Sequence, residues 1–193
     1  ELSNLTPNGM LVPKREHSLE FNLMHRAVVE ALPMLANAKS LLEGLQIPLN
    51  LRVVDGEKNE VRDRRPYATN KLHSDVWSGD PLDAMVAHMP LFGDTESLGV
   101  EFAELPTSDE LDNMKIFDSY DKGFELEKKA SGYGGARYEK GYICFADSRL
   151  LHRTLRKKSG LRISLDIRMR LKTGGVYRKI ADENMSRDRL VNY

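Results

Sequence analysis

The most informative stretch of the chain is Leu161-Arg162-Ile163-Ser164-Leu165-Asp166-Ile167-Arg168-Met169-Arg170-Leu171. Apolar and polar residues alternate strictly along it. Because successive side chains of a β-strand point to opposite faces, the pattern predicts a strand with one apolar and one polar face. Two interpretations of the polar face remain open. It is exposed to water on a half-buried strand, or it lines the interior of a barrel around a charged ligand.

Short strand-like runs precede this stretch, and Gly, Pro and Asp separate them. This spacing favours a β-sandwich or barrel over alternating β-α units. The segment 106–140 is polar and is interpreted as an excursion over the barrel surface, with room for a short helix. Within it, the glycine-rich residues 131–135 are interpreted as a flexible loop. The predicted strands are 49–54, 71–77, 84–91, 98–104, 142–145 and 161–171.

The N-terminal part of the chain has helical rather than strand periodicity. Apolar residues recur at helical spacing from Ser18 to Leu45, with Ser18 as a predicted N-cap and Pro33 as a kink or break. We expect this helix to cover a sheet. The predicted organisation is a single domain, residues 1–193, with a helical cover at about 18–46, a barrel at about 49–171 and a polar tail at 172–193.

Composition excludes several classes of function. The 29 basic and 29 acidic residues give a formal net charge of zero, without the electrostatic footprint of a nucleic-acid or anionic-membrane binder. No apolar run approaches the roughly 20 residues that span a bilayer, and the first residues lack signal-peptide character. Cys144 is the single cysteine, which excludes an internal disulfide or a thiolate zinc cluster. We expect a cytoplasmic protein with a small-molecule partner; a homodimer is compatible with the sequence.

His73 and Asp75 are the first candidate metal ligands. On the strand predicted there, residues two apart share a face, so the imidazole and the carboxylate converge on one point. His152 follows an apolar strand and a turn, and supplies a third ligand from a distant part of the chain. Two histidines and one carboxylate form the facial triad of non-heme Fe(II) oxygenases, whereas zinc prefers a tetrahedron of nitrogen and sulfur ligands.

Arg162 and Ser164 lie side by side on the polar face of the last predicted strand. A guanidinium group and a hydroxyl at this spacing bind a carboxylate in a bidentate manner with one further hydrogen bond. The distal carboxylate of 2-oxoglutarate requires such a site. Arg168, on the same face, competes for this role.

The order His73-x-Asp75, then His152, then Arg162-x-Ser164 ten residues later resembles the Fe(II)/2-oxoglutarate-dependent dioxygenase superfamily. The resemblance covers about residues 70–170. It implies a mainly β (α+β) fold with a double-stranded β-helix (jelly-roll, cupin-like) core and flanking helices. It also implies Fe(II), 2-oxoglutarate and O2 as cofactors and co-substrates. Asp75 stands where halogenating relatives carry a small residue, which favours hydroxylation.

The resemblance implies an oxygenase that hydroxylates a small molecule and releases succinate and CO2, and we expect a sugar-derived or natural-product substrate. Lys71 and Arg153 are candidate substrate contacts, and Trp77 is either a wall of the substrate pocket or a core residue. Two alternatives stay open. One is a cupin-type isomerase or dioxygenase that does not use 2-oxoglutarate, which the Arg162-x-Ser164 pair disfavours. The other is a non-catalytic binding barrel.

Overall fold

The structure is a computed structural model that describes residues 4–32, 34, 42–56, 64–104, 114–135, 138–157, 159–172 and 190–192. Its helical segments are η1 (Arg15–His17), α1 (Ser18–Ala31), η3 (Asp75–Ser78), η4 (Tyr120–Gly123) and α3 (Phe124–Lys129). Its strands are β1 (Leu42–Gln46), β2 (Asn50–Asp55), β3 (Ala84–Gly93), β4 (Val100–Glu104), β5 (Ser131–Gly135), β6 (Cys144–Asp147), β7 (Leu151–Thr154), β8 (Leu161–Leu171) and β9 (Leu190–Asn192).

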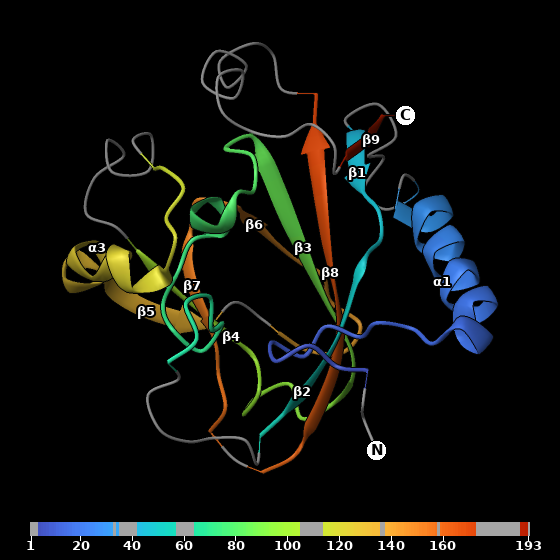
Figure 1. Ribbon diagram of the computed structural model, residues 1–193, viewed down its shortest axis with the longest axis horizontal. Coiled ribbons are helices and arrows are strands. Elements are labelled where there is room, and N and C mark those ends of the chain that lie inside the picture. The colour runs from blue at the N-terminus through green and yellow to red at the C-terminus, as the bar shows by residue number, and fades with distance from the viewer. Residues whose placement is uncertain are drawn as a thin grey trace.

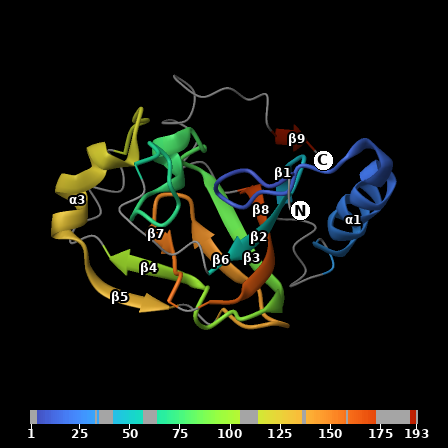
Figure 2. The same ribbon diagram turned by 60° about the horizontal axis from the view of Figure 1, so that its bottom comes forward.

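The strands form two antiparallel sheets, so the chain is mainly β as predicted. The larger sheet has the order β6-β3-β8-β1-β9, with β2 also paired to β8. The smaller sheet has the order β5-β4-β7. Figures 1 and 2 show α1 on one side of the larger sheet and the smaller sheet with α3 on the other. The molecule is therefore layered as helix, large sheet and small sheet.

The strand β8 coincides with the predicted stretch, and its two faces meet different surroundings. Leu165, Ile167 and Met169 belong to the apolar core beneath α1. On the opposite face Arg162, Ser164 and Asp166 are also buried. The polar face of β8 thus lies in the interior of the protein, and the interpretation of this face as water-exposed is wrong.

The predicted N-terminal helix is only partly correct. The helix ends at Ala31, and Leu42–Gln46 forms β1 instead of continuing it. Leu45 is fully buried and pairs with Met169 of β8, so tertiary strand pairing overrides the helical spacing of the leucines. Ser18 is not the N-cap: it is the first helical residue, and its hydroxyl donates back to Arg15 O at 2.8 Å.

The face by which α1 contacts the sheet is not the one that carries its N-terminal leucines. Leu19 and Leu23 are 66% and 54% exposed. The side chains that pack toward the sheet are instead Met24, Val28 and Val29, which contact the core cluster around Leu45. The helix covers the sheet as predicted, but through a face rotated away from the leucines.

Two further segments differ from the sequence-based expectation. Residues 131–135, interpreted as a flexible loop, form β5 and pair with β4. Residues 190–192, within the expected polar tail, form β9 and pair with β1. The short helix expected between 106 and 140 is present as α3. None of the described helices has the length and apolar character that a membrane span needs.

Candidate metal centre

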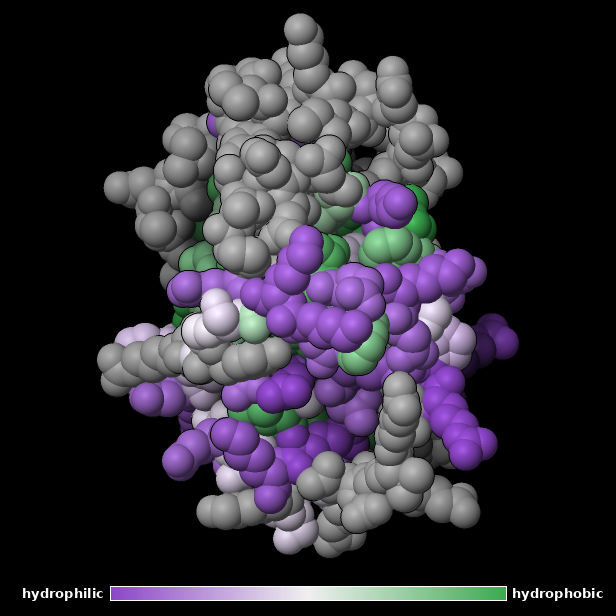
Figure 3. All heavy atoms as spheres, turned by 90° about the vertical axis from the view of Figure 1, so that its left-hand side faces the viewer, coloured by the Kyte–Doolittle hydropathy of each residue, from purple (hydrophilic) through white to green (hydrophobic). Residues whose placement is uncertain are grey.

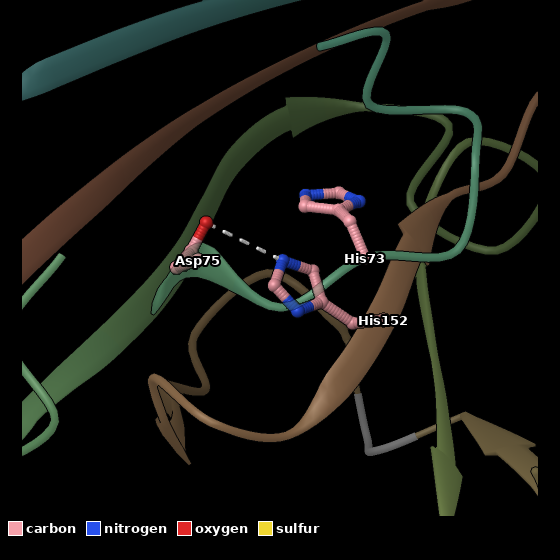
Figure 4. Close-up of side chains that lie close together, drawn as sticks. All are labelled: His73, Asp75 and His152. Carbon is pink, nitrogen blue, oxygen red and sulfur yellow. Dashed lines mark ion pairs between the residues drawn. The ribbon is translucent and has the colours of Figure 1, made fainter. Parts of the chain in front are cut away.

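His73 and His152 are brought together by their own backbones. His73 N donates to His152 O at 2.9 Å, and His152 N donates to His73 O at 2.8 Å, in an isolated antiparallel bridge. The two imidazole rings therefore lie side by side, with 4.4 Å between their centroids, and Figure 4 shows them facing Asp75. The pair predicted from residues 79 positions apart in the chain is thus assembled in space.

The hydrogen bonds of the two rings fix which nitrogen is available. Nδ1 of His73 lies 2.8 Å from Lys71 O, and Nδ1 of His152 lies 3.0 Å from Leu150 O. A carbonyl oxygen only accepts, so each Nδ1 carries the proton and each Nε2 keeps its lone pair. This second hydrogen bond is the one that orients metal-binding histidines in proteins.

Burial keeps both imidazoles neutral. It lowers the pKa of His73 to about 3, and the neighbouring His152 acts in the same direction. Burial likewise lowers the pKa of His152. Since a metal binds the neutral imidazole, protons do not compete for these two nitrogens near neutral pH.

Asp75 approaches the histidines through a turn and not through a strand. It is the first residue of η3, so the prediction of a strand over 71–77 is wrong. The Ser74 hydroxyl accepts from Val76 N at the start of this 3-10 helix, and Gly79, with φ 103°, ends it in the left-handed region. The turn nevertheless brings Asp75 Oδ1 to 3.8 Å from His152 Nε2.

The charge of Asp75 is stabilised inside the protein. Burial acts to raise the pKa of its carboxyl group, but the positive charge of Arg168 outweighs burial and holds the pKa well below its usual range. Arg168 Nη2 donates to Asp75 Oδ1 at 3.2 Å, while Arg168 Nε contacts Asp80. Arg168 is therefore engaged at the metal-ligand end of β8, away from Arg162.

The three side chains fit a metal ion. One ligand atom from each of His73, Asp75 and His152 lies within 4.8 Å of the other two, and all three residues are buried. Ligand atoms about 2.1 Å from one metal lie up to about 4.2 Å apart, so small side-chain rotations complete the site. Two neutral imidazoles and one carboxylate leave the remaining positions of an octahedron open.

The metal centre opens onto a cavity between the two sheets that also contains Arg162. His152 comes from β7 of the small sheet, whereas Arg162, Asp166 and Arg168 come from β8 of the large sheet. Arg162 lies six residues before Arg168 on the same face, about 20 Å along an extended strand. The free volume is about 20 Å³, which is room for one water molecule or ion.

The region around Arg162 contains buried polar atoms without hydrogen-bond partners among the described residues. They are Arg162 Nε, Ser164 Oγ, the Tyr138 hydroxyl and His88 Nε2. The Arg162 guanidinium lies 5.0 Å from the centroid of the Tyr138 ring, and Arg162 Nη1 donates to Leu98 O. Each buried group left unsatisfied costs about 1–3 kcal/mol. The arrangement is suited to an anion that accepts hydrogen bonds from these donors.

Asp166 carries the negative charge in the middle of the cavity. It pairs with Arg52 of β2 and with His88 of β3, whose Nδ1 lies 3.2 Å from Asp166 Oδ1. Burial alone raises the pKa of Asp166, but Arg52 and His88 more than compensate and lower it. His88, interpreted from the sequence as structural, thus lines the cavity beside the metal ligands.

Lys71 and Arg153 line a second pocket, of about 460 Å³, next to the metal centre. Lys71 lies two residues before His73 and Arg153 directly follows His152, so the chain segments that carry the ligands form part of its wall. Trp77 does not line this pocket. It is fully buried in a core cluster, 5.4 Å from the Phe117 ring, which agrees with the core alternative for this residue.

Two of these residues, Tyr138 and Arg52, had no recognisable signal in the sequence. Tyr138 sits in an irregular segment between β5 and β6, and Arg52 lies on a strand whose apolar residues alone were informative. Asp166 and Arg168 were placed on the correct face of β8 by its alternation. The partners of these two residues lie on β2, β3 and η3, which are distant in the sequence and lie beside β8 only in the fold.

No known protein-family model matches the sequence, and no curated protein matches it. Among solved structures, the non-heme alpha-ketoglutarate-dependent epimerase SnoN from nogalamycin biosynthesis is similar, with a TM-score of 0.49 and 15% identity over 91% of this chain and 70% of that chain. An N-substituted L-amino acid dioxygenase in complex with alpha-ketoglutarate, from Burkholderia ambifaria, has a TM-score of 0.41 and 16% identity over 81% and 70%. Both belong to the class of enzymes that the sequence motif resembles.

Proposed function

We propose that this protein is a non-heme Fe(II)- and 2-oxoglutarate-dependent oxygenase. The observation that carries the proposal is the pairing of two sites in one buried cavity. One end holds His73, Asp75 and His152 with both Nε2 lone pairs free, and the other holds Arg162 with unsatisfied donors around it. A ligand that chelates a metal and carries a distant carboxylate matches both ends.

His73, Asp75 and His152 hold the Fe(II) ion in this proposal. The bound ion supplies the activation of O2 together with a keto acid, which is the part of the chemistry that side chains cannot perform. Lys71 O and Leu150 O keep the histidine tautomers correct by accepting from Nδ1. Arg168 keeps Asp75 ionised and fixes one of its oxygens.

Arg162 binds the distal carboxylate of 2-oxoglutarate, and Ser164 and Tyr138 complete its hydrogen bonds. The Arg162 Nε, the Ser164 hydroxyl and the Tyr138 hydroxyl are buried donors with no hydrogen-bond partner among the described residues. Burial raises the pKa of Tyr138, so its hydroxyl keeps its proton and donates. A single carboxylate that accepts from these groups removes several desolvation penalties at once.

Charge balance supports a dianionic co-substrate. Three arginines, Arg52, Arg162 and Arg168, and three aspartates, Asp75, Asp80 and Asp166, line the cavity or contact its lining, so three positive and three negative charges cancel. A divalent metal adds two uncompensated positive charges to this buried region. A dianion such as 2-oxoglutarate restores neutrality, which a buried site strongly favours.

Binding of 2-oxoglutarate requires movement in the cavity. The free volume of about 20 Å³ accepts an ion or one water molecule but not a five-carbon dicarboxylate. Arg52, whose side chain is 14% exposed and pairs with Asp166, lies within this cavity. We expect ligand binding to displace side chains such as Arg52 and to open the space between β7 and β8.

The reaction proposed is hydroxylation of a small sugar-derived or natural-product substrate, with one oxygen atom of O2 entering the product and the other entering succinate as CO2 is released. Lys71 and Arg153 line the adjacent pocket and are the proposed substrate contacts. We also propose that the two sheets form the halves of a double-stranded β-helix and that residues 1–193 are one domain. A cupin-type enzyme without 2-oxoglutarate is less well supported, because it leaves the donors around Arg162 unexplained.

Two substitutions separate metal binding from co-substrate binding. His152→Ala removes a ligand and is expected to abolish Fe(II) binding in equilibrium dialysis and succinate formation with it. Arg162→Ala is expected to keep Fe(II) bound and to raise the 2-oxoglutarate concentration needed for half-maximal succinate formation by about a hundredfold, the value of a charged hydrogen-bonded anchor. His17→Ala, at an exposed histidine of η1, is the control. Equal succinate formation by wild type and His152→Ala would contradict the proposed ligand set.

A further inference from the structure

The pocket beside the metal centre has the size and position of a substrate site. Its volume of about 460 Å³ is within the range of small-molecule sites. Its wall comprises the residues that flank His73 and His152 together with the η4–α3 segment. Tyr120 belongs to this wall and stacks on His73, with 4.2 Å between ring centroids and 17° between ring planes. A molecule in this pocket therefore lies next to the proposed iron ligands.

Both cations of the pocket already have carboxylate partners. Lys71 Nζ lies 2.8 Å from Asp121 Oδ2, and Arg153 Nε donates to Glu101 Oε2 at 2.7 Å. These pairs neutralise the positive charges of the two candidate substrate contacts. An added anion has to compete with Asp121 and Glu101.

Glu127 of α3 is different. It lines the same pocket, is half-buried, and has no ion-pair partner within 4.0 Å among the residues that the structure describes. The neighbouring cation Lys128 is directed elsewhere, because its Nζ pairs with Glu125 and lies 4.5 Å from the centroid of the Phe124 ring. The charged groups named above comprise three cations and four carboxylates, which leaves them with one excess negative charge. Figure 3 shows the hydrophilic side chains that gather on the α3 side of the molecule.

We propose that this pocket binds the primary substrate and that the substrate carries an ammonium group, which Glu127 recognises. Hydroxyl groups of the same molecule accept hydrogen bonds from Lys71 and Arg153, and Phe124 and Tyr120 contact its carbon skeleton. A half-buried carboxylate without a counter-ion gains a charge-assisted hydrogen bond from such a ligand, whereas a neutral ligand leaves it uncompensated. This assignment rests on the proposed oxygenase function and narrows its substrates to amine-bearing small molecules.

The test uses three sugars of similar size that differ in charge: glucosamine, glucose and glucuronate. Each is titrated calorimetrically into the metal-free protein and into the protein loaded anaerobically with Fe(II) and 2-oxoglutarate. We expect glucosamine to bind about tenfold more tightly than the other two. Glu127→Gln is expected to remove this preference. Glu125→Gln, on the same short helix but paired with Lys128, is the matched control and is expected to keep it.

The possible outcomes separate this inference from the proposed function. Equal or tighter binding of glucose or glucuronate, no binding of glucosamine, or an unchanged preference in Glu127→Gln would overturn the role of Glu127. Because no proposed iron ligand lines this pocket, the preference for glucosamine is expected in the metal-free protein as well. Failure of the oxygenase function appears separately, as metal-loaded protein that does not bind 2-oxoglutarate.

Discussion

At the scale of single residues, Arg168 connects the metal centre to the large sheet. Its Nη2 donates to Asp75 at 3.2 Å and its Nε contacts Asp80, so one guanidinium group holds both ends of the turn that follows His73. Burial lowers the pKa of Arg168, but the two carboxylates more than offset burial and raise it. The guanidinium is therefore a permanent counter-ion of Asp75 in the metal-free protein.

Substitution of Arg168 tests its role as the counter-ion of Asp75. Arg168→Met removes the cation that Asp75 and Asp80 share, and it is expected to lower the free energy of unfolding by about 3–5 kcal/mol. A bound divalent cation neutralises Asp75, so metal binding is expected to raise the melting temperature more in Arg168→Met than in wild type. Arg170→Met, on the same strand and paired with Asp83, is the control without this enhanced response. The comparison requires thermal unfolding with and without Mn(II), and equal metal-induced shifts in the two variants would count against the role of Arg168.

The protonation of His73 predicts a pH dependence of stability. Its pKa is about 3 in the folded protein and 6.5 in the unfolded chain. Between these values the unfolded chain binds a proton that the folded protein does not, so a fall in pH across this window lowers the free energy of unfolding. The loss for His73 reaches about 1.4 kcal/mol per pH unit. Below about pH 4, protonation of Asp75 and Asp166 adds to it, because their pKa values are lowered on folding.

Urea denaturation of the metal-free protein across this pH range measures the effect. His73→Gln cannot titrate, so the dependence of stability on pH is expected to become shallower between about pH 6.5 and about pH 4. His17→Gln, at an exposed histidine, is expected to keep the wild-type slope. If His73→Gln also keeps it, His73 is not a buried neutral imidazole.

At the scale of secondary structure, α1 allows a test of which face covers the sheet. Leu45 of β1 is fully buried beneath α1, whereas Leu23 of α1 is 54% exposed. Leu45→Ala is expected to lower the free energy of unfolding by about 2–5 kcal/mol, and Leu23→Ala by less than about 0.5 kcal/mol. Chemical denaturation of both variants checks this. Comparable losses would show that the helix is rotated from the position described here.

The secondary structure was predicted correctly from the sequence in some segments and incorrectly in others. Alternation over 161–171 predicted β8 with its bounds, because a strand with one apolar face leaves a period of two in the sequence. Helical spacing misled at Leu42–Gln46, where pairing with β8 decides the conformation. Pro33, predicted as a kink or break, lies outside the described residues, and spacing alone did not show that Leu42–Gln46 becomes a strand.

The candidate metal ligands His73, Asp75 and His152 lie together as the sequence predicted, but through a different local geometry. His73 and Asp75 were expected to converge because strand residues two apart share a face. They converge instead because Ser74 and Gly79 delimit a 3-10 turn that aims Asp75 at the bridge between His73 and His152. The contact of Tyr138 with Arg162 joins segments that are distant in the sequence, and so do the ion pairs of Arg52 and Arg168. No local sequence pattern predicts such contacts.

At the scale of the whole molecule, the candidate site depends on both sheets. β7 of the small sheet presents His152, β8 of the large sheet presents Arg162, and η3 supplies Asp75 between them. The apolar face of β8 packs under α1, which leaves the polar face to line the cavity. A metal and a dianion bound between the sheets would link the two layers, and Arg168 of β8 already pairs with Asp75 of η3.

The most direct test of this arrangement is an anaerobic titration of Fe(II)-loaded protein with 2-oxoglutarate, followed by visible absorption. Chelation of iron by the keto acid produces a metal-to-ligand charge-transfer band, which requires a metal centre with open positions. We predict that the band appears in wild type and saturates at one 2-oxoglutarate per iron. Iron that binds to the protein without producing this band would contradict the proposal that His73, Asp75, His152 and Arg162 form one site for iron and 2-oxoglutarate.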